Sequence, residues 1–243
     1  MRDLRRDVRY SQLMTRAVFF DVDWTLIHPG PTFLGEGYKA FCARHGIDVD
    51  ADRFHDAVAA AAPFLDSGDE RYTDELFVVY TRKIVEGMGG IGPNLDACAQ
   101  EIYREWAACQ HFELYEDVPD VLRELSSAGL RIGLISNSHR CLASFQSHFE
   151  LQGLITATVS SSVHGFLKPH PSIFAAALQL VDVAPPEAVM VGDSLAHDVE
   201  GAMRVGMHGI LLHRGEARPA RAEQLGVPVI RSLRDLPPLL SLA

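Results

Sequence analysis

The stretch RAVFFDVDWTL, from Arg16 to Leu26, carries the strongest fold signal in the sequence. It begins with an apolar run that ends abruptly at Asp21 and Asp23. Buried parallel strands appear in a sequence as continuous hydrophobic runs, and polar side chains follow where such a strand leaves the core. The stretch therefore predicts a central parallel strand with two carboxylates at its carboxyl end.

Four further runs of this kind occur later in the chain, and helical patterns lie between them. The runs are RIGLISNS (131–138), ITATVSS (155–161), AVMVGDS (188–194) and GILLHR (209–214). The amphipathic helices are expected at 118–128, 140–149, 172–181 and 195–205. Alternating strands and helices with polar groups at the strand ends are typical of an α/β fold. We expect a doubly wound, Rossmann-like parallel sheet whose ligand site lies over its carboxyl edge.

The segment 29–116 breaks this alternation. It shows no strand signal and four helical patterns, at 34–45, 51–61, 69–86 and 95–110, so it predicts an all-helical insert after the first strand. The core is then expected to consist of residues 16–28 and 117–243. Residues 1–15 are interpreted as an Arg-rich N-terminal arm, either a disordered segment or an artefact of start-site choice.

Composition excludes several classes of protein. The chain has 22 basic and 32 acidic residues, a net charge of −10, and no long run of Lys or Arg, so nucleic acid is not an expected partner. No apolar stretch reaches the roughly 18 residues that span a bilayer, so no membrane partner is expected. The four cysteines form no CxxC pair, which favours a cytoplasmic location. A monomer or homodimer is expected.

Four motifs resemble those of the haloacid dehalogenase-like (HAD) hydrolase superfamily, in the superfamily's order. The stretch from Asp21 to Leu26 resembles the DxDxT signature. Ser136-Asn137 resembles the second motif, Lys168 with the residues after it the third, and Gly192 to Asp198 the fourth. The matching region runs from about residue 16 to 215, and the insert resembles the helical C1-type cap of phosphatases in this superfamily.

The resemblance implies a phosphoryl-transfer chemistry that suits these residue types. Asp21 would be the nucleophile and form an aspartyl-phosphate. Asp23 would protonate the leaving oxygen and then activate water. Lys168 would place positive charge beside Asp21. The phosphate oxygens would be held by Thr25, Ser136 and Asn137, the last through backbone amides.

The resemblance also implies Mg²⁺ as cofactor, because a phosphate approaches a carboxylate only with a hard cation between them. Asp21, Asp193 and the backbone carbonyl of Asp23 would bind it, and Asp198 would either join the metal shell or orient Lys168. Taken alone, Asp193 could cap the following helix and Lys168 could be a solvated loop charge. The presence of all four motifs in order favours the active-site interpretation.

Two residues are candidates for contacts with the organic part of the substrate. Trp24 stands where many relatives have glycine, and it would touch the leaving group or the cap; a purely structural aromatic is the alternative. Arg71 lies in the segment 63–73, which is either a substrate-reading loop of the cap or a solvated turn.

These observations predict a Mg²⁺-dependent phosphatase acting on a small phosphorylated metabolite. A phosphomutase of the β-phosphoglucomutase type is the main alternative, because it would retain all these residues. A dehalogenase is less favoured because a halide leaves without a proton and so does not need Asp23, and a non-catalytic binding protein is less favoured because all four motifs look intact. Phosphoglycolate, sugar phosphates and nucleotides all remain open as substrates.

Overall fold

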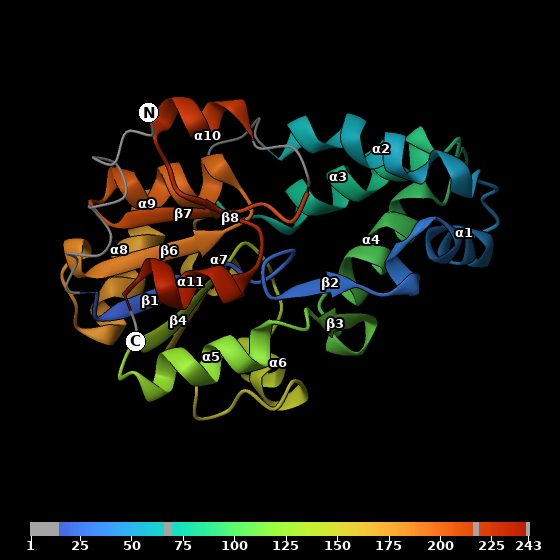
Figure 1. Ribbon diagram of the computed structural model, residues 1–243. Helices are drawn as coiled ribbons and strands as arrows, with labels where there is room; N and C mark the ends of the chain where they lie inside the picture. Colours follow the sequence, from blue (N-terminus) through green and yellow to red (C-terminus); the bar gives the residue numbers. More distant parts are fainter. Residues whose placement is uncertain (1–14, 66–69, 216–218, 242–243) are drawn as a thin grey trace. The chain divides into compact units, whose positions relative to one another are not determined.

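The structure is a computed structural model that describes residues 15–65, 70–215 and 219–241 (Figure 1). It divides into two compact units. Unit 1 takes the described residues up to His28, then Leu114–Asn137 and those from Leu142 onward; unit 2 takes those of Pro29–Glu113 together with Ser138–Cys141. The expected N-terminal arm lies outside the described residues except for its last position.

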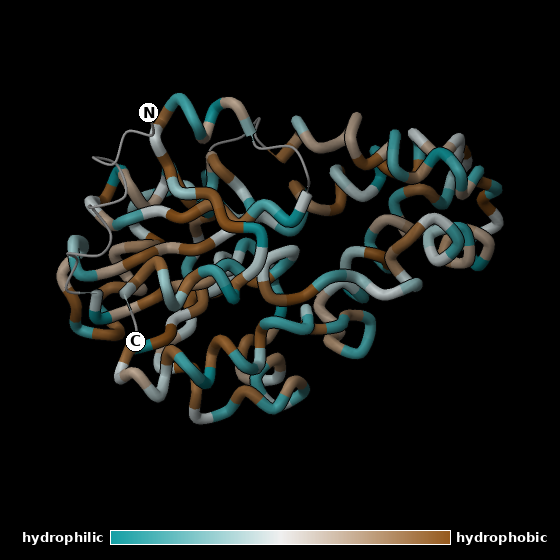
Figure 2. The backbone as a smooth tube through the Cα atoms, viewed as in Figure 1, coloured by the Kyte–Doolittle hydropathy of each residue, from teal (hydrophilic) through white to brown (hydrophobic). Residues whose placement is uncertain are grey.

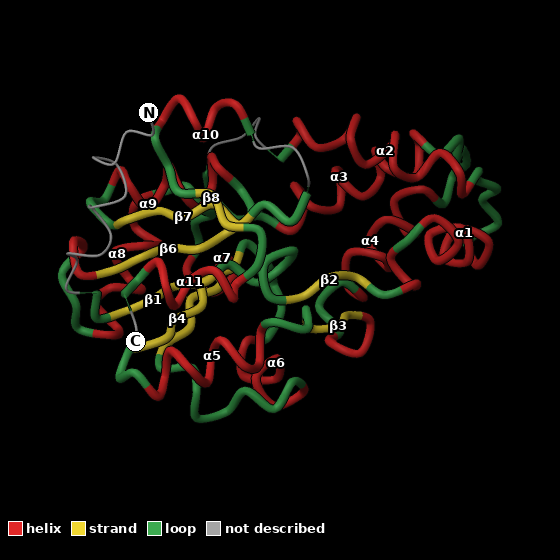
Figure 3. Tube along the Cα trace, in the orientation of Figure 1, coloured by secondary structure: helices red, strands yellow, loops and turns green. Residues whose placement is uncertain are grey.

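Unit 1 is built on a parallel sheet of six strands in the order β5-β4-β1-β6-β7-β8 (Figure 3). The strands are β1 (Ala17–Phe20), β4 (Arg131–Ser136), β5 (Ala157–Ser160), β6 (Ala188–Gly192), β7 (His208–Leu212) and β8 (Val229–Ile230). The predicted α/β fold is confirmed. The last strand was not expected, since two residues are too few to give a pattern.

Strand β1 lies in the middle of this sheet because all four of its side chains are apolar and fully buried. Its neighbours β4 and β6 are also largely apolar, although β4 begins at Arg131 and ends at Ser136 (Figure 2). In the register, Phe19 stands opposite Gly133, where an added Cβ would come within 2.4 Å of the Phe19 ring. Glycine at position 133 therefore lets the aromatic ring lie across the neighbouring strand.

Helices cover the two faces of the sheet. They are α5 (Val118–Ser127), α6 (Leu142–His148), α7 (Ser161–His164), α8 (Pro171–Val181), α9 (Gly201–Arg204), α10 (Ala220–Leu225) and α11 (Leu236–Leu239). Helix α8 buries Ile173 and Phe174 in a core cluster with Phe19 and Met190 of the sheet. Helix α5 packs on β4 through its own apolar stripe. This packing holds the carboxyl ends of the strands in place.

Unit 2 is mainly helical. Its helices are α1 (Gly35–Arg44), α2 (Phe54–Ala61), α3 (Asp74–Gly87) and α4 (Leu95–Glu105). Helix α3 packs against both α2 and α4. It begins at Asp74 rather than at residue 69 because the Thr73 hydroxyl accepts a hydrogen bond from the Leu76 amide at 3.3 Å and so caps it there. The helix expected at 95–110 is α4, which ends earlier, at Glu105.

The expectation of an entirely helical insert was wrong in one detail. Strand β3 (Phe112–Leu114) lies in this segment and pairs with β2 (Ile27–Pro29) where the chain leaves and re-enters unit 1. Three residues are too few to show strand alternation in the sequence. Among the described residues, no helix combines the length and apolar character that crossing a membrane requires.

Candidate active site

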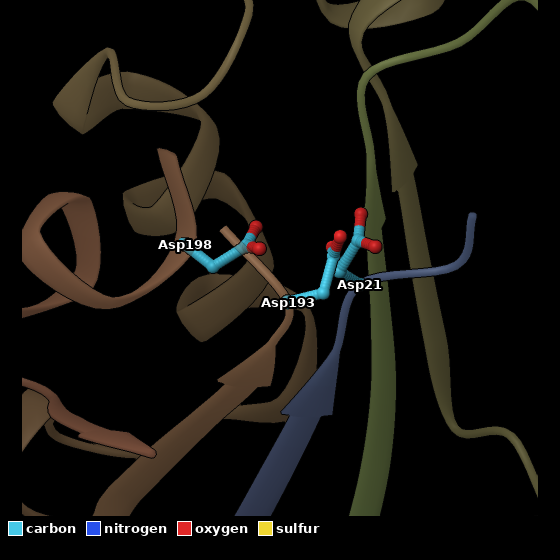
Figure 4. A group of neighbouring side chains, drawn as sticks. All are labelled: Asp21, Asp193 and Asp198. Carbon is cyan, nitrogen blue, oxygen red and sulfur yellow. The ribbon is translucent and has the colours of Figure 1, made fainter. Parts of the chain in front are cut away.

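Asp21 and Asp193 follow the neighbouring strands β1 and β6 and come together at the carboxyl edge of the sheet. The strands pair in parallel, and the Asp21 amide donates to the Val191 carbonyl at 3.0 Å. This bond carries the pairing one residue past the end of β1, so Asp21 lies opposite Gly192 and Asp193 follows one position further along the neighbouring chain segment. Figure 4 shows the two carboxylates side by side, with Asp198 approaching from a separate segment.

Lys168 places a buried ammonium group against two of these carboxylates. Its side chain is 2% exposed, and Nζ lies 2.6 Å from Asp21 Oδ1 and 2.7 Å from Asp198 Oδ1. Nζ donates hydrogen bonds to Asp21 Oδ1 and, at 2.7 Å, to the Ile135 carbonyl. These bonds and the ion pair with Asp198 together fix the charge in position.

Asp198 reaches Lys168 because the chain after β6 does not form the regular helix that the sequence predicted. Residues Leu195–Glu200 form a π-helical turn, with the Ser194 amide donating to Asp198 Oδ2 at 3.0 Å. Glycine at 192 is also required, since a Cβ there would lie 2.2 Å from the Asp198 carboxylate. π-turns are frequent at functional sites, and this one turns a carboxylate inward.

Asn137 holds the backbone of Lys168. Its Oδ1 accepts from the Lys168 amide at 2.7 Å, and its Nδ2 donates to the Lys168 carbonyl at 2.9 Å. The side chain of Asn137 is thus committed to Lys168, which leaves its backbone as the part that could face a phosphate. Ser136, fully buried, is the last residue of β4.

Asp23, Trp24 and Thr25 form a tight turn after Asp21. The Leu26 amide donates to the Val22 carbonyl at 2.8 Å, and Trp24 has a φ of 66°. This left-handed conformation is uncommon for a residue with a Cβ. Thr25 is fully buried, and its hydroxyl has no hydrogen-bond partner in the part of the chain that the structure describes.

Burial and neighbouring charges shift the pKa values of Asp21, Lys168 and Asp193. Burial raises the pKa of Asp21 to about 7; Lys168 opposes this rise, and Asp198 and Asp23 add to it. Burial alone would lower the pKa of Lys168, but Asp198 and Asp21 raise it above its usual value, so the ammonium stays protonated. Desolvation and the negative charges of Asp21 and Asp198 raise the pKa of Asp193 to about 8. Because Asp193 is exposed, these neighbouring charges are the better-supported cause.

The donor set fits a hard divalent cation. Ligand oxygens of Asp21, Asp193 and Asp198 all lie within 4.8 Å of one another, and the single positive charge of Lys168 pairs with two of the three carboxylates. Two negative charges are therefore left unbalanced when all three carboxylates are ionised. Lys168 and the Ser194 amide contact both oxygens of Asp198, whereas Lys168 contacts Asp21 through Oδ1, so Asp21 and Asp193 are the pair best placed to bind the ion.

The structure adds residues that sequence reasoning missed. The Ile135 carbonyl has no local signature that would mark it. Gly192 stands first in the fourth motif, but the motif alone does not indicate that it makes room for the Asp198 carboxylate. Arg214 follows β7 at the same sheet edge and contacts Asp117, and its position after a strand was the one available signal. Arg71 belongs to unit 2, and part of its segment, residues 66–69, lies outside the described residues, so its role stays a prediction.

The fold and site define an α/β enzyme whose acidic centre and buried lysine lie at the carboxyl edge of a parallel sheet. The chain belongs to the haloacid dehalogenase-like hydrolase family, whose model matches residues 15–206. It is 28% identical over 216 residues to human haloacid dehalogenase-like hydrolase domain-containing protein 3, covering 83% of each chain. It is 29% identical over 240 residues to human N-acylneuraminate-9-phosphatase, covering 93% of each. The HAD phosphatase from Thermococcus onnurineus shares the fold, with a TM-score of 0.64, 24% identity and coverage of 93% of this chain and 98% of that one.

Proposed function

We propose that this hydrolase is a Mg²⁺-dependent phosphatase that cleaves a small-molecule phosphate monoester through an aspartyl-phosphate on Asp21. The contact between Asp21 and the buried Lys168 ammonium, at 2.6 Å, carries the proposal. It sets a nucleophilic carboxylate and fixed positive charge where a phosphoryl group would transfer. The similarity to a protein named as a phosphatase over 93% of the chain supports the same reaction class.

The proposed reaction uses the carboxylates in two steps. Asp21 attacks phosphorus while Asp23 gives its proton to the leaving oxygen, so the ester bond breaks as the acyl-phosphate bond forms. Asp23, now ionised, takes a proton from water, and the hydroxide displaces Asp21 from phosphorus. Mg²⁺, bound by Asp21, Asp193 and the Asp23 carbonyl, would neutralise the charge of the incoming phosphate. Asp198 holds Lys168 in place throughout.

We also propose that unit 2 serves as a C1-type cap and that the enzyme is a cytoplasmic monomer or homodimer acting on a phosphorylated metabolite. The insertion of unit 2 directly after the β1 turn and its four main helices support the cap assignment. The four cysteines are scattered in the sequence and form no CxxC pair, which is consistent with a reducing compartment.

The test is phosphate release from p-nitrophenyl phosphate and from a panel containing phosphoglycolate, sugar phosphates and nucleotides. We expect release with Mg²⁺, loss of release with EDTA, and recovery when Mg²⁺ is added back. The Asp193→Asn variant should need a higher Mg²⁺ concentration for half-maximal rate, because it removes one charged ligand.

Release that continues unchanged in EDTA would contradict the metal requirement. If the folded protein releases phosphate from no ester in the panel, the phosphatase proposal fails. An isomerisation assay primed with a sugar bisphosphate would then distinguish a mutase from a binding protein.

Trp24 is proposed to contact the organic part of the substrate. It is 47% exposed and adjacent to Asp23. Trp24→Gly relieves the strain of the left-handed backbone in the folded state, which stabilises the protein. It also gives the unfolded chain more conformational freedom, which destabilises the protein. The free energy of unfolding should therefore change by less than about 1 kcal/mol. We expect the ratio of kcat/KM values between esters to change. Equal ratios in wild type and variant would show that Trp24 has no part in selectivity.

A further inference from the structure

Arg214 joins three parts of unit 1 that are distant in sequence, and the proposed chemistry does not use it. Its guanidinium makes two hydrogen bonds to the Asp117 carboxylate, each of 3.0 Å. The same Nη2 also donates to the Thr25 carbonyl at 3.2 Å. The Tyr115 ring lies under the guanidinium, with the central carbon 3.7 Å from the ring centroid.

Asp117 gives Arg214 a fixed anchor. Its side chain is 4% exposed, and beyond Arg214 it accepts hydrogen bonds from the Ser232 hydroxyl at 2.7 Å and from the Leu233 amide at 2.8 Å. A two-pronged bond between arginine and a carboxylate sets both the position and the plane of the guanidinium. The anchored Asp117 carboxylate therefore sets the direction in which Arg214 Nη2 points toward Thr25.

The segment that Arg214 holds is the turn carrying the proposed acid. The turn runs through Asp23, Trp24 and Thr25, and Trp24 sits in the left-handed region at a φ of 66°. Such a conformation is unfavourable in a residue with a Cβ, so the surrounding structure must maintain it. Within the turn, the Trp24 amide donates to the Ile27 carbonyl at 2.7 Å. The hydrogen bond from Arg214 to the Thr25 carbonyl constrains the turn from a separate segment of the chain.

We propose that Arg214 is a positioning residue that keeps the Asp23–Thr25 turn in its active geometry. This rests on the proposed role of Asp23 as proton donor and acceptor. Arginine is required because its planar fork reaches both Asp117 oxygens and the Thr25 carbonyl at once. A lysine ammonium keeps the charge but cannot span the three acceptors.

The experiment compares Arg214→Lys with Arg221→Lys. Arg221 is a matched control, since it also pairs with a carboxylate, Glu200 at 2.9 Å, but is 67% exposed and its partner lies outside the Asp23–Thr25 turn. At a temperature where each variant is folded, we expect kcat to fall about tenfold or more in Arg214→Lys and to stay unchanged in Arg221→Lys. A misplacement of 1 Å costs up to ~100-fold in rate. Added guanidinium should partly restore turnover in Arg214→Ala, provided that variant folds.

A second measurement does not depend on catalysis. The chain has two tryptophans, and a Trp106→Phe background leaves Trp24 as the single fluorophore in the turn. Trp106 contacts Arg140 through its backbone carbonyl, which the replacement keeps. Arg214→Lys should shift the emission of Trp24 and increase its quenching by acrylamide, whereas Arg221→Lys should do neither.

The two measurements separate this inference from the proposed function. A wild-type protein without phosphate release would refute the phosphatase, while the Trp24 signal would still report whether Arg214 holds the turn. With an active wild type, a lower kcat together with an altered Trp24 signal supports the proposal. Wild-type kcat in Arg214→Lys, or a lower kcat with an unaltered Trp24 signal, overturns it.

Discussion

Asp21→Asn is expected to abolish phosphate release, with a loss in kcat on the order of 10⁴ or more, the range found when a catalytic nucleophile is removed. The amide cannot form the acyl-phosphate. The fold should persist, because Lys168 keeps its contact with Asp198 at 2.7 Å and its bond to the Ile135 carbonyl. Phosphate release and circular dichroism measured on the same preparation check both statements.

Asp120→Asn is the matched control for this experiment. Asp120 is an exposed carboxylate on α5 that pairs with Arg123 at 3.1 Å, so its replacement should leave turnover unchanged. Acid-quenched wild-type enzyme should carry the mass of one phosphoryl group on the peptide containing Asp21, and the Asn variant should not. Turnover in Asp21→Asn equal to that of Asp120→Asn would remove Asp21 as the nucleophile.

Asp117→Asn is expected to give the largest loss of stability, about 3–5 kcal/mol in the free energy of unfolding, the usual cost of breaking a buried ion pair from one side. The Asp117 carboxylate accepts four hydrogen bonds, and its loss leaves Arg214 without a charged partner. Urea unfolding measures the change. Asp120→Asn serves again as the control, because an exposed pair contributes ~0–1 kcal/mol.

The difference between these variants should depend on pH. Burial alone would raise the pKa of Asp117, but the bonds from Arg214, Ser232 and the Leu233 amide outweigh it and hold the pKa below its usual value. A lowered pKa in the folded state stabilises the protein above the unfolded pKa of about 3.9, and this stabilisation is lost as the pH falls through the folded pKa. The destabilisation in Asp117→Asn should therefore be full at neutral pH and shrink below about pH 4. A difference that does not change with pH would argue against an ionised Asp117.

Arg214 contributes both to the stability of unit 1 and, in our proposal, to catalysis. The same guanidinium that pairs with Asp117 also holds the Thr25 carbonyl, so Asp117→Asn and Arg214→Lys should both disturb the Asp23–Thr25 turn. Their effects on turnover are not expected to add, since the two residues act through one contact.

The sequence by itself determined five of the six described strands of the sheet and the kinds of polar side chain at their carboxyl ends. Unbroken apolar runs ending in Asp21, Ser136 and Asp193 report both burial and the point where each strand ends, and these are local properties of the chain. Parallel strands then bring their carboxyl ends to one edge wherever the helices lie. That is why the positions of Asp21, Lys168 and Asp193 followed from motifs and strand order.

Only the tertiary structure decided how the site is held together. The Asn137 side chain supports the backbone of Lys168, the π-helical turn brings Asp198 onto the same ammonium, and Arg214 reaches back to Thr25. The Asn137–Lys168 and Arg214–Thr25 contacts join residues 31 and 189 positions apart. Short strands such as β3 and β8 also lack a readable pattern. Hydropathy and spacing describe what each residue meets in its own segment, whereas these contacts depend on how separate segments pack.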